Sequence, residues 1–124
     1  MLLLSDDEAL SDLVFGIVEP PWKLVRQSAD GYLSHKTFAQ PNVRLVILDD
    51  QAVKEDDRNW LLAQIREDFN GSSLLYVAGS QSDDNEKRAR TNGAHYYIPK
   101  PLPHQRFAHV LRSFLRLTSQ GINP

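Results

Sequence analysis

Apolar residues form two kinds of pattern along the chain. Short apolar runs are typical of strands buried in a sheet, and they predict strands at 1–4, 22–26, 43–48, 74–78 and 96–98. Elsewhere apolar residues recur at spacings of three and four, which is typical of one face of a helix. This spacing predicts helices at 10–18, 61–69 and 103–115. Polar segments with helix-stop signals predict two more, at 32–39 and 84–92.

The boundaries between these elements carry turn and stop signals. Pro20-Pro21 ends the first helix, Asn70-Gly71 and Gly93 end two others, and Pro103 opens the last. The alternation of strand and helix predicts a mostly parallel sheet with helices on both faces, a doubly wound α/β fold. A length of 124 residues suggests one domain. We expect that domain at 1–118, followed by a tail or the start of a linker at 119–124.

Composition excludes several classes of function. The net charge is -2 and no run of Lys and Arg is present, so we expect no direct contact with nucleic acid. The absence of cysteine excludes a disulfide framework, a thiolate zinc site and a cysteine nucleophile. No stretch reaches the ~18 apolar residues of a membrane span, and the apolar start is too short for a signal peptide. We therefore expect a cytoplasmic protein without membrane contact.

Candidate chemistry lies where the predicted strands end. The first strand ends in Asp6-Asp7, the third in Asp49, and the fifth leads to Lys100. Sites in open α/β sheets form beyond the carboxyl ends of the strands. Converging carboxylates repel one another, and Mg²⁺, which takes oxygen ligands, would relieve that repulsion. With the lysine, such a pocket could hold a phosphoryl group, and a carboxylate can carry that group covalently.

Three segments together resemble the receiver family of response regulators. Residues 3–8 (LLSDDE) resemble the strand-1 motif of two acids, and 42–49 resemble the strand that carries the phosphoacceptor. Residues 93–101 (GAHYYIPKP) resemble the family's "GA..Y..KP" segment, which is the most specific of the three. The matches occur in the right order over almost the whole chain. The resemblance implies a CheY-like, flavodoxin-like (βα)5 domain with strand order 2-1-3-4-5.

The resemblance also implies roles for single residues. Asp49 matches the phosphoacceptor, and Lys100 the lysine that pairs with the acceptor or its phosphate. Asp7 matches the direct magnesium ligand and Asp6 its water-mediated partner. The acceptor carboxylate and the backbone carbonyl of Gln51 would complete the protein ligands of the metal.

The resemblance also concerns the conformational change that follows phosphorylation in this family. Tyr97 matches the aromatic residue whose rotamer reports phosphorylation, and the Lys100-Pro101 bond is usually cis in this family. The family expects Thr or Ser at the end of strand 4, but Ala78 stands there. Ser80, two residues on, does not occupy that position, although its hydroxyl could approach the site. Phosphorylation could therefore survive while its coupling to the tyrosine is weakened.

Two functional hypotheses follow. In the first, a histidine kinase or phosphotransfer protein phosphorylates Asp49. The charged site then shifts the helix 4–strand 5–helix 5 face, through which an output partner or a second copy binds. The resemblance implies at most self-catalysed phosphotransfer and dephosphorylation, so we do not expect a conventional metabolic enzyme. In the second, the chain is a degenerate pseudo-receiver that binds proteins without phosphate. Ala78 supports the second hypothesis, whereas the acids and Lys100 argue against it.

The remaining polar residues receive plainer interpretations. We expect Asp50 to be a bystander, because only one acid at that strand end should point into the pocket. A flavodoxin-type cofactor domain shares the architecture, but the acids at 6–8 would repel a cofactor phosphate. The four histidines are not spaced as metal ligands, and we expect them at the surface: His35, His95, His104 and His109.

Overall fold

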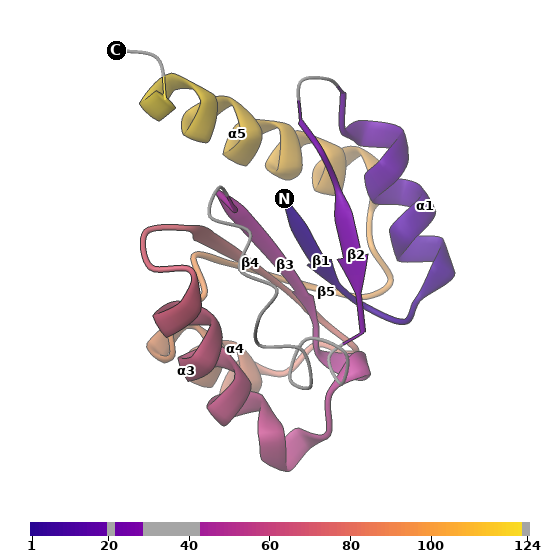
Figure 1. Cartoon of the computed structure of the whole chain (residues 1–124). Coiled ribbons are helices and arrows are strands. Elements are labelled where there is room, and N and C mark those ends of the chain that lie inside the picture. Colours follow the sequence, from indigo (N-terminus) through magenta and orange to yellow (C-terminus); the bar gives the residue numbers. More distant parts are fainter. Residues whose placement is uncertain (20–21, 29–42, 123–124) are drawn as a thin grey trace.

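A sheet of five parallel strands forms the centre of the molecule, in the order β2-β1-β3-β4-β5 (Figure 1). The computed structural model describes residues 1–19, 22–28 and 43–122. Its topology confirms the doubly wound α/β fold and the strand order 2-1-3-4-5. The helix predicted at 32–39 and His35 lie outside the described residues.

The strands fall close to their predicted places. They are β1 (Leu2–Leu4), β2 (Val25–Gln27), β3 (Leu45–Asp49), β4 (Ser73–Ala78) and β5 (Tyr96–Pro99). Strand β1 pairs with both β2 and β3, and the register places Leu4 opposite Leu48. The residues that follow β1 therefore lie beside the end of β3, which brings the two acidic segments to one edge of the sheet.

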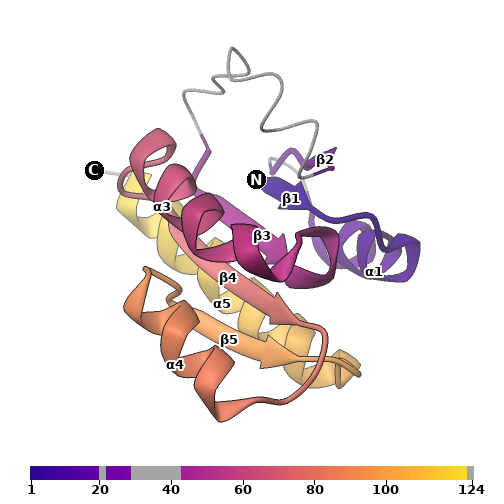
Figure 2. The ribbon, with the colours of Figure 1, turned by 90° about the horizontal axis from the view of Figure 1, so that it is seen from below.

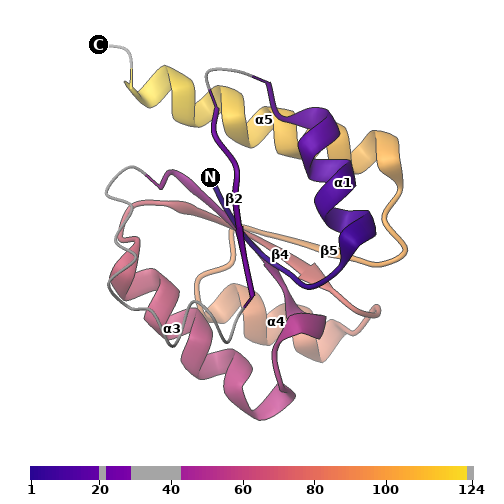
Figure 3. The ribbon, with the colours of Figure 1, turned by 45° about the vertical axis from the view of Figure 1, so that its right-hand side comes forward.

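Four helices are described, and they cover the two faces of the sheet in pairs. Helices α1 (Glu8–Ile17) and α5 (His104–Ile122) lie on one face, and α3 (Arg58–Asp68) and α4 (Asp83–Thr91) on the other (Figures 2 and 3). Helix α5 continues past the apolar face at 107–115 to Ile122, so it extends into the segment at 119–124 that was expected as a tail or the start of a linker. No proline interrupts it before Pro124, and proline is the residue that most strongly stops a helix.

Two hydrophobic layers follow from the alternation of side chains along the strands. Successive strand residues point to opposite faces. Leu3 accordingly packs with the α1 and α5 side chains, whereas Leu2 and Leu4 pack with those of α3 and α4. The largest fully buried apolar side chains come from both layers: Phe107, Leu3, Leu4, Leu45, Ile47, Leu48, Leu61, Leu62, Leu75, Ile98 and Leu111. The sheet is thus fixed from both sides, and its carboxyl edge is a rigid base for the loops.

The loops at that edge are short and partly ordered by turns. The segment after β3, predicted as a polar loop, forms two 3₁₀ turns at Asp50–Ala52 and Glu55–Asp57. After β4, the chain turns through residues 79–82, and the Ser82 side chain accepts a hydrogen bond from the Asn85 N–H to cap α4. Within the described residues, no helix is long and apolar enough to span a membrane.

Candidate functional site

An ammonium group joins the ends of three strands at the carboxyl edge of the sheet. Lys100 Nζ lies 2.8 Å from Asp7 Oδ2 and 3.1 Å from Asp49 Oδ2. It also donates to Gln51 Oε1 at 2.8 Å. The backbone N–H of Lys100 donates to the Ala78 carbonyl at 2.8 Å, and the Lys100–Pro101 peptide bond is cis. The structure therefore brings together three of the predicted site residues, with the Gln51 side chain as a fourth contact.

The Asp49 carboxylate is buried, with 1% of its side chain exposed. Besides Lys100, it accepts a hydrogen bond from Ser5 Oγ at 2.8 Å and one from the Gln51 N–H at 3.2 Å. Ser5 Oγ in turn accepts from the Asp7 N–H at 3.0 Å, so this hydroxyl links the two acids. Burying a carboxylate costs several kcal/mol unless charge and hydrogen bonds compensate it. These contacts supply that compensation.

Asp7 has two tasks at once. Its Oδ1 accepts from the N–H groups of Ala9 and Leu10, at 2.9 and 3.2 Å, which caps α1, and its Oδ2 binds Lys100. The hydrogen bond from Lys100 holds the pKa of Asp7 below its ordinary value, against the opposing effect of partial burial. One oxygen of Asp7 therefore caps α1 while the other pairs with Lys100.

The charge of Lys100 is secured by its neighbours. Burial alone would lower the pKa of its ammonium group, but hydrogen bonds and charge from Asp7 and Asp49 outweigh that effect and raise the pKa. The lysine is therefore cationic across the physiological range. A fixed positive charge beside a buried carboxylate is suited to stabilising added negative charge at Asp49.

The predicted metal ligands are only partly assembled. Asp6 is exposed, and in the described part of the chain no hydrogen bond or ion pair joins it to Asp7, Asp49 or Lys100. Within that same part, no three His, Cys, Asp or Glu side chains gather closely enough to hold a metal. Asp7 and Asp49 nevertheless face one point, which Lys100 Nζ now occupies. Two hard oxygen donors in this arrangement fit the chemistry of Mg²⁺, provided that the lysine gives way.

Asp50 does not point into the Asp49 pocket, as expected, but the expectation that it is a bystander is wrong. It is 2% exposed and accepts hydrogen bonds from Tyr76 Oη at 3.0 Å, the Gly79 N–H at 2.8 Å and Asn85 Nδ2 at 3.2 Å. Arg58 Nη1 adds an ion pair at 3.8 Å. Asp50 begins a 3₁₀ turn after the end of β3, and its carboxylate lies among side chains of β4, α3 and α4.

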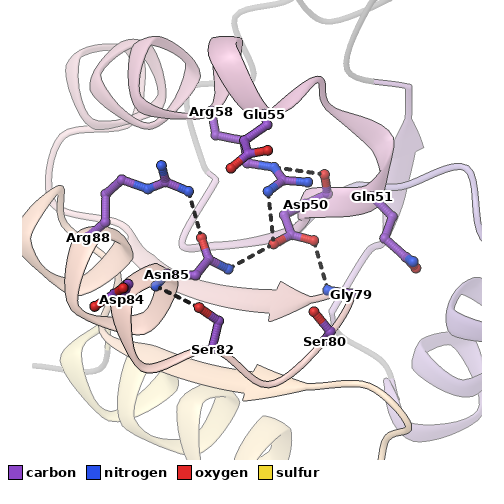
Figure 4. A pocket seen from close by; sticks show the side chains of 10 residues that line it. All are labelled: Asp50, Gln51, Glu55, Arg58, Gly79, Ser80, Ser82, Asp84, Asn85 and Arg88. Carbon is purple, nitrogen blue, oxygen red and sulfur yellow. Dashed lines mark hydrogen bonds and ion pairs between the residues drawn. The ribbon is translucent and has the colours of Figure 1, made fainter.

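A cavity of about 720 Å³ opens beside Asp50, between the loops that follow β3 and β4 (Figure 4). In Figure 4, Arg58 and Asn85 both point toward the Asp50 carboxylate, and Arg88 reaches Asn85 from the far side. All the residues that line it except one glycine have polar or charged side chains: Asp50, Gln51, Glu55, Arg58, Gly79, Ser80, Ser82, Asp84, Asn85 and Arg88. The Ser80 side chain lies in this cavity.

Tyr97 is buried, with 4% of the residue exposed, in the same core cluster as Ala78. Its hydroxyl accepts from Asn85 Nδ2 at 3.1 Å and donates to the Ser80 carbonyl at 3.3 Å. Its ring stacks on Tyr76, with centroids 5.4 Å apart. Burial raises the pKa of the Tyr97 phenol above its ordinary value. The tyrosine therefore has a complete set of partners without any phosphoryl group.

Sequence patterns did not reveal four of the residues that build these networks. Ser5 is a lone hydroxyl between an apolar run and two acids, and nothing in its position distinguishes it from a strand end. Arg58, Tyr76 and Asn85 belong to separate elements that converge only in the folded chain. The doubled acid at 49–50 was the one available signal, because two buried carboxylates in sequence need two sets of partners.

Comparisons with known proteins bear on the fold. No protein-family model and no curated protein matches the sequence. Among solved structures, a CheY-like receiver domain protein from Methanospirillum hungatei has a TM-score of 0.76 at 20% identity, covering 97% of this chain and 95% of that one. A signal receiver domain of a histidine kinase from Clostridium thermocellum has a TM-score of 0.75 at 19% identity, covering 92% and 94%. This chain has the fold of a response regulator receiver domain.

One of the similar solved structures is a much longer chain, of which this fold is only a part. NtrX from Brucella abortus has a TM-score of 0.73 at 24% identity, and the match covers 97% of this chain but 26% of that one. The resemblance that the three sequence motifs indicated is thus confirmed at the level of the receiver fold. At these identities the likeness concerns the fold, so the activity has to be argued from the site itself.

Proposed function

We propose that this receiver-fold chain accepts a phosphoryl group on Asp49 and acts in two-component signalling. The observation that carries the proposal is the buried Asp49 carboxylate, which lies 3.1 Å from the ammonium group of Lys100. A buried acid paired with a cation at a strand end is suited to carrying additional negative charge. The donor is a histidine kinase or a phosphotransfer protein, and the site of action is the cytoplasm.

The chemistry requires an Asp49 oxygen to attack phosphorus. The new oxygen–phosphorus bond forms as the bond between phosphorus and the donor breaks, which leaves an acyl phosphate on the protein. Lys100 neutralises charge on the transferred group, and positioning supplies most of the remaining catalysis. The Gln51 side chain lies against Gly79 and accepts from Lys100, so it must move aside to admit a donor.

Magnesium is part of the proposal. Asp7 and Asp49 supply the carboxylate donors, with Asp6 and the Gln51 carbonyl as the expected outer and main-chain ligands. The bound ion would supply positive charge opposite the incoming phosphoryl group. Because Lys100 contacts both acids in this structure, the lysine must release Asp7 for the ion to enter. We therefore expect Mg²⁺ binding to require Asp7 and to shift the NMR signals of the Lys100 side chain.

The face that responds is expected to consist of α4, β5 and α5. Output domains, partner proteins or a second copy of the chain would bind there. This face is next to the site, because β5 leads directly into Lys100 and α4 begins just after the loop that Asp50 anchors. The chain itself is expected to make no contact with nucleic acid or membrane.

Intact mass spectrometry after incubation with acetyl phosphate and Mg²⁺ tests the proposal. We expect a gain of one phosphoryl group in the wild type, none in Asp49→Asn, and a retained gain in Asp12→Asn, whose acid is exposed on α1. No gain in the folded wild type, with the donor active on a known receiver, would contradict the proposal. The pseudo-receiver hypothesis would then replace it.

A further inference from the structure

A polar network centred on Asp50 ties together elements that are distant in the sequence. One carboxylate oxygen accepts from the Gly79 N–H, which fixes the loop after β4. The other accepts from Tyr76 Oη and Asn85 Nδ2. Arg58 contributes its Nε to the Asp50 carbonyl at 3.2 Å and its Nη1 to the carboxylate. The residue next to Asp49 is therefore anchored to three neighbouring elements, α3, β4 and α4.

The same network extends to Tyr97 through a single amide. Asn85 Nδ2 donates both to Asp50 and to the Tyr97 hydroxyl, and Asn85 Oδ1 accepts from Arg88 at 2.9 Å. The Tyr97 hydroxyl in turn donates a hydrogen bond to the Ser80 carbonyl. In this series of hydrogen bonds each N–H or O–H donates to an oxygen that can accept, so all the bonds can form at the same time.

The residue at the end of β4 cannot link Tyr97 to Asp49. Ala78 offers no hydroxyl with which to contact either Asp49 or the aromatic ring beside it. Within the described residues, no hydrogen bond links the Tyr97 hydroxyl to Asp49 or Lys100. The polar contacts that keep Tyr97 inside all belong to the Asp50–Asn85 network and the loop that it anchors. A buried phenol without partners would be costly, so these contacts stabilise the buried position of the ring, together with its stacking on Tyr76.

We propose that Asp50 and Asn85 are positioning residues that hold Tyr97 in its buried position without phosphate. Phosphorylation of Asp49 then leaves the Tyr97 ring where it already is. The second statement rests on the proposed function, whereas the first concerns the unmodified chain and stands without it. Tyr97 is then a fixed residue of the face formed by α4, β5 and α5, and its ring does not move when Asp49 is phosphorylated.

NMR spectra of protein with ¹³C-labelled tyrosine rings test both statements. The Tyr97 signals are assigned by their loss in Tyr97→Phe. In the unmodified wild type we expect one sharp set of signals for this ring, unchanged on addition of beryllofluoride and Mg²⁺. In Asn85→Ala we expect these signals to shift or broaden before any phosphate mimic is added, and to change further when it is added. Asn92→Ala, at the other end of α4, is the matched control and should behave as wild type.

Asp50→Asn gives an independent measurement that does not depend on the tyrosine. The Gly79 N–H donates to the Asp50 carboxylate, and a neutral acceptor is weaker. We expect hydrogen exchange of the Gly79 amide to accelerate about tenfold in this variant, in line with the loss of one charge-assisted bond. Should Asp50→Asn fail to fold, the Asn85→Ala spectra still decide the question.

The outcomes separate this proposal from the proposed function. A Tyr97 signal in Asn85→Ala that matches the wild type would overturn the positioning role. A wild-type Tyr97 signal that moves strongly with beryllofluoride would show that the ring is not held, and would overturn the second statement. Intact mass of the same wild-type sample after acetyl phosphate reports phosphorylation separately. A failure of phosphate transfer with the expected Asn85→Ala result would leave the positioning role standing.

Discussion

At the scale of single residues, two neighbouring buried acids have divergent surroundings. Asp49 faces Lys100 and Ser5, whereas Asp50 faces Arg58, Tyr76 and the loop after β4. Each carboxylate has its own cation and its own hydroxyl donor. The two acids therefore belong to separate polar networks, and the proposed phosphoacceptor is the one paired with Lys100.

Lys100 should be the largest single contributor to the stability of the site. Lys100→Ala leaves two carboxylates facing each other, one of them buried, and removing one partner of a buried pair is strongly destabilising. Because the lysine is partly exposed, we expect a loss of about 2 kcal/mol in the free energy of unfolding, below the range for a fully buried pair. Urea titration measures it, with exposed Lys87→Ala as the control. A loss below ~0.5 kcal/mol would show that the pair is not coupled to folding.

Alkaline pH should weaken the fold partly through Tyr76. Burial first, and then the charge of Asp50, raise the pKa of its phenol above the ordinary value of 10.0. A raised folded-state pKa means that stability is fully present below pH ~10 and is lost as the unfolded chain ionises above it. We expect Tyr76→Phe to reduce this loss between pH 9 and about 12, although the substitution lowers stability at neutral pH by about 1–3 kcal/mol because Asp50 loses a donor. Urea titrations across this range give the slope, and an unchanged slope in the variant would exclude the assignment.

At the scale of elements, local signals determined the helices and strands that were predicted well. Unbroken apolar runs marked β3 and β4, and Asn-Gly and Pro signals marked the ends of α3 and the start of α5. The prediction was less accurate where no local signal exists. Strand β2 begins at Val25 rather than 22, because pairing with β1 and not composition selects its residues. Helix α5 continues to Ile122, because no proline precedes Pro124 to stop it.

Helix α4 has a single buried residue, Ala89, so we expect it to depend on its N-terminal cap more than the other described helices do. The Ser82 hydroxyl accepts from the Asn85 N–H at 3.2 Å and so fixes the turn that carries Asn85. We expect Ser82→Ala to cost about 1 kcal/mol of unfolding free energy and to speed amide exchange in the first turn of α4. Ser82→Asp, which keeps a capping oxygen, should restore both. Equal exchange in all three proteins would contradict a capping role.

At the scale of the whole molecule, the order of the strands assembles the site. Asp7, Asp49 and Lys100 are separated by most of the chain, yet the sheet places the ends of their strands at one edge. The sequence motifs predicted this convergence, because each motif stands at a strand end. The Asp50–Asn85–Tyr97 network could not be predicted in the same way. Its members have no shared motif, and their meeting depends on how α3 and α4 pack on the sheet.

The central claim, that Asp49 and not Asp50 carries the phosphoryl group, can be tested at the level of the peptide. Wild-type protein is incubated with acetyl phosphate and Mg²⁺ and then reduced with borohydride, which converts an acyl phosphate of aspartate to homoserine. Proteolysis and sequencing by mass spectrometry locate the converted residue. We expect homoserine at position 49, with none in Asp49→Asn and an unchanged site in Asp12→Asn. Homoserine at position 50, or at neither position in protein that is folded, would contradict it.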